Sequence, residues 1–69
     1  MKGRVKWFNQ LKGYGFIKAD GGEDVFVHLT GLFDKSKRDL MVEEAEVEFE
    51  MRDGKKGPAA YNVVVLAGA

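Results

Sequence analysis

Three aromatic rings and one histidine fall on two short stretches with the spacing of β-strands. Tyr14 and Phe16 are two residues apart in KGYGFI (residues 12–17), and Phe26 and His28 are two apart in DVFVH (residues 24–28). Side chains two apart on a strand share a face, so each stretch has an aromatic face and an opposite aliphatic face. The aliphatic faces are expected to enter the core, which leaves the rings directed toward water.

Rings exposed on a sheet suit the binding of unpaired nucleobases. Every base has a flat face, and stacking on an aromatic side chain contributes about 1–3 kcal/mol per base, whereas bases inside a duplex do not offer these faces. Trp7 lies on the preceding stretch and extends the set. Cations set beside the rings would follow the sugar–phosphate backbone, and Lys6, Lys12 and Lys56 are the candidates. The residues therefore predict a single-stranded nucleic-acid partner.

Two other classes of function compete with this interpretation. The rings could form the centre of a binding site for a partner peptide, as in other small β-barrels. An enzyme is disfavoured because the chain has one histidine, one serine (Ser36) and no cysteine, and it has no complete phosphate-cradling glycine motif. No catalytic residue, metal site or cofactor is predicted.

Five strands are expected from the alternation of apolar residues and the turn residues between them. They cover residues 2–9, 14–19, 24–29, 46–52 and 59–66, with a tight turn at residues 20–22 and further turns at 10–13 and 53–58. Lys6 and Trp7 are adjacent, so both can face the ligand side only if the first strand contains a β-bulge. The end of the chain, residues 67–69, is expected to fray.

Residues 30–42 form a long connection without a clean period. Leu32 and Met41 are expected to close one end of a barrel, and the charged run at residues 35–38 is interpreted as a solvated loop or, alternatively, a phosphate contact. No helix longer than about one turn is expected there. Five short strands with one long connection indicate an all-β fold, a small closed antiparallel barrel.

Composition limits the remaining possibilities. The chain has 69 residues, which suits one domain. It has no cysteine, no apolar run near the ~20 residues of a membrane span and no apolar signal-peptide segment. A cytoplasmic protein is therefore expected. The net charge is zero, but five bases and no acid precede Asp20, and five acids and no base fall within residues 43–50. Binding of nucleic acid must then depend on a local basic face and on non-ionic contacts. The fourth strand, which carries the acids outward, is expected to lie away from that face.

Four motifs together resemble the bacterial cold-shock proteins. They are KWFN (residues 6–9), KGYGFI (12–17), DVFVH (24–28) and GPAA followed by Asn62-Val63 (57–63), and they cover most of the chain apart from residues 30–45. RNA-recognition-motif domains have similar ring motifs, but in the opposite order and with two helices. The resemblance implies a single cold-shock domain over residues 1–69 with the oligonucleotide-binding (OB) fold.

The resemblance also implies a function and a set of binding residues. Similar proteins bind single-stranded RNA or DNA, prefer pyrimidines, and act as RNA chaperones or regulators of transcription and translation. The binding positions that it implies are Lys6, Trp7, Phe8, Lys12, Tyr14, Phe16, Asp24, Phe26, His28, Lys56 and Pro58. Monomers and strand-exchanged dimers both remain open.

Several positions depart from the family pattern. Leu29 stands where an aromatic residue is usual, Lys56 where arginine is common, and Tyr61 where a small residue is usual. Phe33 either replaces a ring missing from the loop or is buried, and Tyr61 either adds a stacking ring or fills the core. The expected mode of binding is unaffected, but affinity and base preference depend on these positions.

Overall fold

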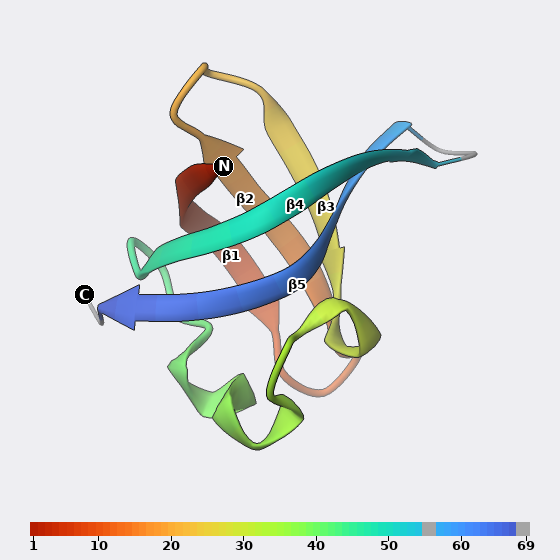
Figure 1. Ribbon diagram of the computed structural model, residues 1–69. Helices are drawn as coiled ribbons and strands as arrows, with labels where there is room; N and C mark the ends of the chain where they lie inside the picture. Colours follow the sequence, from red (N-terminus) through yellow and green to blue (C-terminus); the bar gives the residue numbers. More distant parts are fainter. Residues whose placement is uncertain (55–56, 68–69) are drawn as a thin grey trace.

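The computed structural model describes residues 1–54 and 57–67, which form five strands and two short 3₁₀ helices (Figure 1). The elements are β1 (Lys2–Asn9), β2 (Tyr14–Ala19), β3 (Asp24–His28), η1 (Leu29–Gly31), η2 (Lys35–Leu40), β4 (Glu46–Gly54) and β5 (Gly57–Ala67). The predicted five-stranded all-β fold is confirmed. Between β3 and β4, η2 spans 6 residues, which is about two turns of a 3₁₀ helix, where no more than about one turn was expected.

The strands close into a barrel in the order β1-β2-β3-β5-β4. Four of the five pairings are antiparallel, but β3 and β5 run parallel through Phe26↔Ala59 and Val27↔Ala60. The predicted five-stranded closed barrel is therefore confirmed, with this one pair parallel. The reason is parity, because strand directions cannot alternate all the way around a ring with an odd number of members.

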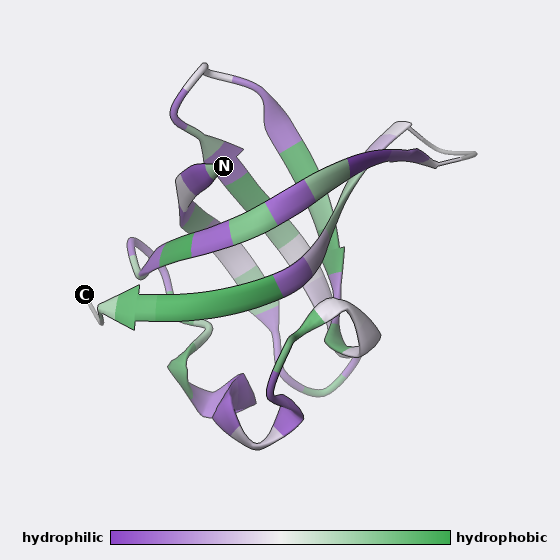
Figure 2. Ribbon diagram, in the orientation of Figure 1, coloured by the Kyte–Doolittle hydropathy of each residue, from purple (hydrophilic) through white to green (hydrophobic). Residues whose placement is uncertain are grey.

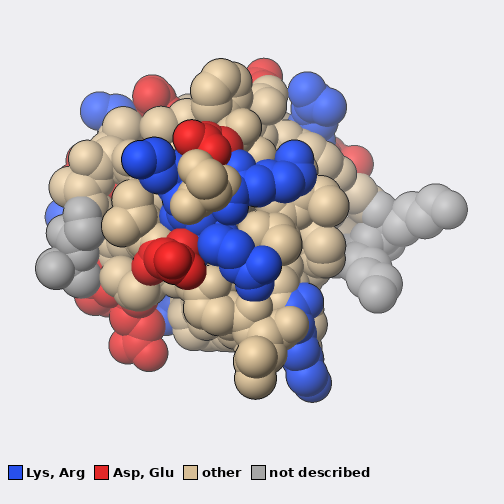
Figure 3. Space-filling view, turned by 90° about the horizontal axis from the view of Figure 1, so that it is seen from below, with Lys and Arg blue, Asp and Glu red and all other residues tan. Residues whose placement is uncertain are grey.

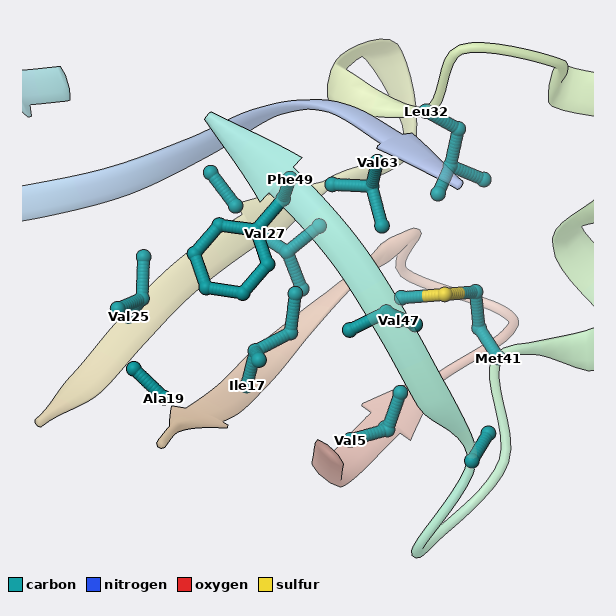
Figure 4. Packing of buried hydrophobic residues seen from close by; sticks show 12 residues of the cluster. Val5, Ile17, Ala19, Val25, Val27, Leu32, Met41, Val47, Phe49 and Val63 are labelled. Carbon is teal, nitrogen blue, oxygen red and sulfur yellow. The ribbon is translucent and has the colours of Figure 1, made fainter. Parts of the chain in front are cut away.

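The core is apolar and lies inside the barrel (Figure 4). Alternation along β1, β2 and β3 directs Val5, Ile17, Val25 and Val27 inward, and all four are fully buried. The other buried apolar residues are Ala19, Leu32, Met41, Ala45, Val47, Phe49, Ala60 and Val63. Leu32 and Met41 are both buried and lie at one end of the cluster, as predicted for residues that close the barrel.

A β-bulge interrupts β1 between Val5 and Trp7. The bulge shifts the pairing with β2 by one residue, so that Val5 is buried while both Lys6 and Trp7 are exposed. A bulge was expected if both side chains were to point to the same side of the sheet, and the structure contains it.

Strand ends differ from the predictions by a few residues. The third strand ends at His28, one residue early, because the His28 side chain accepts a hydrogen bond from the Thr30 N–H and caps η1, which starts at Leu29. The last strand starts at Gly57 and includes Ala67, which was expected to fray. Residues 68–69, the rest of that expected tail, lie outside the described residues.

β4 alternates as predicted. Val47 and Phe49 are buried, whereas Glu48 and Glu50 are exposed and Glu46 is half-buried, which is visible as alternating colours along β4 in Figure 2. β4 and β5 form the wall opposite to β2 and β3, so the acidic strand lies away from the aromatic one.

Candidate nucleic-acid interface

The rings named from the sequence come together on the outer face of β1, β2 and β3. Trp7 pairs with Phe16 across β1 and β2, Phe16 with Phe26 across β2 and β3, and Tyr14 with His28. We call these five residues the ring surface. Directly opposed side chains on one face of a sheet are in contact distance, so the strand register alone makes this surface continuous.

The four aromatic rings contact one another in a fixed pattern. Ring centroids are 5.5 Å apart for Trp7–Phe16, 5.8 Å for Trp7–Tyr14, 5.7 Å for Phe16–Phe26 and 6.0 Å for Tyr14–Phe26. The first three pairs are tilted or edge-on, at 51°, 71° and 77°, and the last is stacked at 30°. These arrangements are favourable for aromatic pairs, so the rings hold one another in place without a ligand.

The ring surface is open to solvent to different degrees. Trp7 is 38% exposed and His28 is exposed, while Tyr14, Phe16 and Phe26 are half-buried, chiefly by each other. None of the three turns into the core. Phe33 does not cover them and is not buried: it is exposed and lies beside β5 with Val63, Val64 and Leu40.

Two predicted binding residues pair with each other. The Lys6 ammonium donates to an Asp24 carboxylate oxygen at 3.1 Å, and both side chains are about half exposed. An exposed ion pair contributes about 0–1 kcal/mol. Separating Lys6 from Asp24 would therefore cost little free energy.

Lys12 is exposed on the turn between β1 and β2, and this turn is tightly held. The Lys12 N–H donates to the Asn9 side chain at 2.9 Å, and Gly13 has φ of 75°, a conformation that favours glycine. Lys12 therefore projects from a fixed backbone beside the ring surface.

Arg38 secures that turn from the other side of the chain, and the sequence did not predict this. Its guanidinium donates to the Gln10 backbone oxygen, and the Gln10 amide donates to the Arg38 backbone oxygen at 2.8 Å. Arg38 is half-buried and differs from the solvated residue that was expected. A run of charges gives no sign of a contact 28 residues away, so local pattern alone could not have found it. Lys35 and Lys37 of the same run are exposed as expected, and Figure 3 shows lysine and arginine side chains gathered near the middle of the face that η2 occupies.

His28 has one ring nitrogen engaged. Its Nδ1 accepts from the Thr30 N–H at 3.2 Å and lies 3.0 Å from the Thr30 hydroxyl. Acceptance at Nδ1 places the proton of the neutral ring on Nε2. The imidazole is thereby fixed in orientation, and the side chain is exposed.

Phe8 stands apart from the ring surface. It is half-buried and packs against the core, at the edge of the predicted site. Its strand neighbour Gly15 is buried because β1 and β2 approach closely there, and a Cβ at Gly15 would lie 2.7 Å from the Phe8 Cα. Gly15 is thus required by strand packing.

Pro58 lies near the start of β5. It is half-buried and directly precedes Ala59, which pairs with Phe26 of the ring surface. Lys56 lies outside the described residues.

Tyr61 does not fill the core. It is exposed on the outer face of β5 opposite Glu50, and the Arg52 guanidinium lies 5.0 Å from its ring centroid. This is a cation–π contact. Leu29, at the position of a missing ring, packs against the core.

The described residues contain neither a metal-binding cluster nor a membrane-spanning helix. Within residues 1–54 and 57–67, no three histidine, aspartate or glutamate side chains lie close enough together to share a metal ion. In the same residues, none of the helices has the length and apolar character needed to cross a membrane.

Comparison with known proteins gives a consistent result over almost the whole chain. Residues 1–66 match the family model described as the 'Cold-shock' DNA-binding domain. The chain is 52% identical over 67 residues to the cold shock-like protein CspC of Shigella flexneri and to that of Escherichia coli K12, covering 96% of each chain. It is also 52% identical over 65 residues to the cold shock protein CspB of Geobacillus stearothermophilus, covering 94% of this chain and 97% of the relative.

The match agrees with the closed five-stranded barrel and the exposed cluster of rings. Proteins of this family bind nucleic acid and are not enzymes. The chain belongs to the cold-shock domain family and is a nucleic-acid-binding domain.

Proposed function

We propose that the protein binds single-stranded RNA or DNA by stacking bases on the ring surface, and that it acts as an RNA chaperone or as a regulator of transcription or translation. Residues 1–69 form one cold-shock domain in this proposal. The observation that supports it most is the set of four rings within 5.5–6.0 Å of their neighbours on one outer wall. Folding alone does not require large rings on the wet side of a sheet.

The proposed mechanism begins with bases that are already unpaired. Successive bases stack on the exposed faces and edges of five side chains, Trp7, Tyr14, Phe16, Phe26 and His28. Because the rings hold one another in place, little side-chain freedom is lost on binding. A strand held in this way cannot pair with a second strand, which is how a binding protein without catalysis would keep RNA unpaired.

Lysines at the border of the ring surface are proposed to follow the sugar–phosphate backbone. Lys6 and Lys12 are exposed there, and Lys56 enters the proposal from the sequence alone. Asp24 is proposed to accept from a base edge once Lys6 turns to phosphate, and Pro58 and Phe8 to pack at the two margins. A preference for pyrimidines is part of the proposal and rests on the family resemblance.

A competition titration tests this function. Oligothymidylate is added while Trp7 fluorescence is followed, because Trp7 is the single tryptophan and belongs to the ring surface. We expect strong quenching by oligothymidylate, oligocytidylate and oligouridylate, and weak competition by a duplex of the same length. Unchanged fluorescence at low salt, or a duplex that competes equally well, would overturn the proposal.

A further inference from the structure

The second half of β5 is apolar on both of its faces. In VVVL (residues 63–66), Val63 is buried and Val65 packs against the core, yet Val64 and Leu66 on the outer face are 41% and 43% exposed. Figure 2 shows this part of β5 as an unbroken hydrophobic stretch, in contrast to the alternation along β4. A strand with this composition is typical of one that is covered on both faces.

A groove runs beside this stretch, between β5 and η2. Its volume is about 300 Å³, and it is lined by Leu32, Phe33, Asp34, Lys37, Leu40 and residues 63–65. Phe33 is 72% exposed although its N–H is bonded to the Val63 oxygen at 2.9 Å, and Leu40 is 44% exposed. The backbone thus fixes a bare ring at the border of an apolar groove.

One edge of β5 is also unpaired beside the groove. β4 pairs with one edge as far as Ala67, but on the other edge β3 pairs only with Ala59 and Ala60, followed by a single bridge from Leu32 to Val63. Beyond Val63, no strand pairs with this edge among residues 1–54 and 57–67. An apolar strand edge of this kind readily pairs with another chain.

We propose that the surface formed by Phe33, Leu40, Val64, Leu66 and the free edge of β5 binds a second copy of this chain across a two-fold axis. Such an interface requires a self-complementary surface. This surface offers an exposed ring, Phe33, beside a groove lined by Val63 and Val64. Two β5 edges related by a two-fold axis would run antiparallel and pair with each other.

The charges at the groove support the same occupant. Asp34 and Lys37 both line it, so the groove carries charges of both signs and does not present one sign to a second copy. Lys37 of η2 lies on one side of the surface, but on the other side Glu48 pairs with Val64, and Glu46 with Ala67, on the neighbouring strand. These carboxylates would repel phosphate.

The interface is small, and this sets the expected strength of association. An apolar patch of this kind exposes roughly 400 Å² per copy, so the pair would bury roughly 800 Å², which is at the low end for specific interfaces. We therefore expect a weak dimer that dissociates on dilution. The ring surface lies on the opposite wall of the barrel, so both copies remain able to bind nucleic acid.

Sedimentation velocity on the full chain without nucleic acid tests the proposal. From about 10 μM to about 1 mM, the range in which a small interface dissociates, we expect the mean mass to rise toward that of a dimer. Phe33→Lys and Val64→Lys should each weaken the association at least tenfold. Leu11→Lys is the matched control, because Leu11 is 99% exposed and does not line the groove.

Three outcomes would overturn the proposal. The first is a chain that stays monomeric throughout the range, which would leave the groove to a different protein. The second is an equal effect of Phe33→Lys and Leu11→Lys on the association. The third is a dimer that exchanges subunits over hours and is unaffected by both groove variants, as a strand-exchanged dimer would be. Quenching of Trp7 by oligothymidylate should be unchanged in Phe33→Lys monomers. That readout separates loss of the interface from loss of the fold, and it separates this proposal from the one on nucleic-acid binding.

Discussion

At the scale of single residues, the rings of the ring surface act as each other's supports. Phe16 is in contact with both Trp7 and Phe26, at 5.5 and 5.7 Å between centroids, and Tyr14 contacts the same two rings. Each ring therefore offers stacking area and also limits the motion of its two neighbours. Loss of any one ring is expected to affect binding both directly and through the rings that it supports.

Truncation of Phe16 or Phe26 should weaken binding to single strands. Phe16→Ala and Phe26→Ala are each expected to raise the dissociation constant for oligothymidylate about 5- to 150-fold, which corresponds to about 1–3 kcal/mol. Fluorescence titration measures the effect, and chemical denaturation confirms that the variants are folded. Leu11→Ala serves as the control and should bind as the parent does; a loss of similar size there would argue against a specific surface.

The two glycines at positions 15 and 21 allow a matched test of strand packing. A Cβ at Gly15 would meet the Phe8 Cα at 2.7 Å, and a Cβ at Gly21 would meet a Glu23 carboxylate oxygen at the same distance. Backbone cannot yield as a side-chain end can, so Gly15→Ala should lower the free energy of unfolding by about 1–3 kcal/mol. Gly21→Ala should change it little. Equal effects in urea denaturation would show that the β1–β2 approach is less tight than described.

Residue identity alone predicted part of this detail. Alternation in KGYGFI and DVFVH was enough to place Tyr14, Phe16 and Phe26 outside the core, because period two fixes the face of a strand. The ion pair of Lys6 with Asp24, and the position of Arg52 over Tyr61, depend on which strands become neighbours. That information is not local, and the sequence pattern did not supply it.

At the scale of elements, the strands were predictable and the connection between β3 and β4 was not. Alternation of apolar residues and the turn residues between strands indicate where the strands lie, and the boundaries of β1 and β2 agreed with prediction. Residues 30–42 have no period, so neither η1 and η2 nor the attachment of Arg38 to Gln10 could be foreseen. The parallel β3–β5 pair follows only once the barrel is known to close.

Asp34 gives a pH-dependent test of the η2 segment. It accepts from the Ser36 hydroxyl at 2.6 Å and from the Ser36 N–H at 3.0 Å, and these bonds, with Lys37 nearby, lower the pKa of Asp34 below its usual 3.8. A carboxylate with a lowered pKa stabilises the fold above the unfolded value, and this contribution is lost as the pH falls through the folded value. The cap is therefore present at neutral pH and absent in strong acid.

Asp34→Ala should lower the thermal midpoint at pH 7 by a small amount, and the difference from the parent should vanish as the pH drops well below 3.8. Thermal unfolding at several pH values measures this. Asp39→Ala changes an exposed acid in the same segment and is the control. A difference that persists or grows in acid would contradict the capping role.

At the scale of the whole molecule, the net charge is zero, but two walls of the barrel differ in charge. Bases gather before Asp20 and acids on β4, and the barrel places β4 and β5 opposite to β2 and β3. One wall is thereby suited to nucleic acid and the other, in our inference, to a second copy of the chain. The fold class and the ring surface could be predicted from sequence, but the separation of the two walls required the strand order.

The salt dependence of binding should reflect this charge distribution. With Lys6, Lys12 and Lys56 as the phosphate contacts, the slope of log K against log salt for single strands is expected to be about −2 or shallower. Titrations across a range of salt concentrations measure the slope. A slope of about −5 or steeper would mean that many more cations are engaged than the ring surface borders.

The most direct test of the account is an isotope-edited nuclear Overhauser measurement on the protein bound to oligothymidylate. We expect close contacts from the thymine methyl and H6 protons to the ring protons of Trp7, Phe16, Phe26 and His28. Contacts confined to Phe33, Tyr61 or the outer face of β4, or no contacts to the ring surface at all, would contradict it.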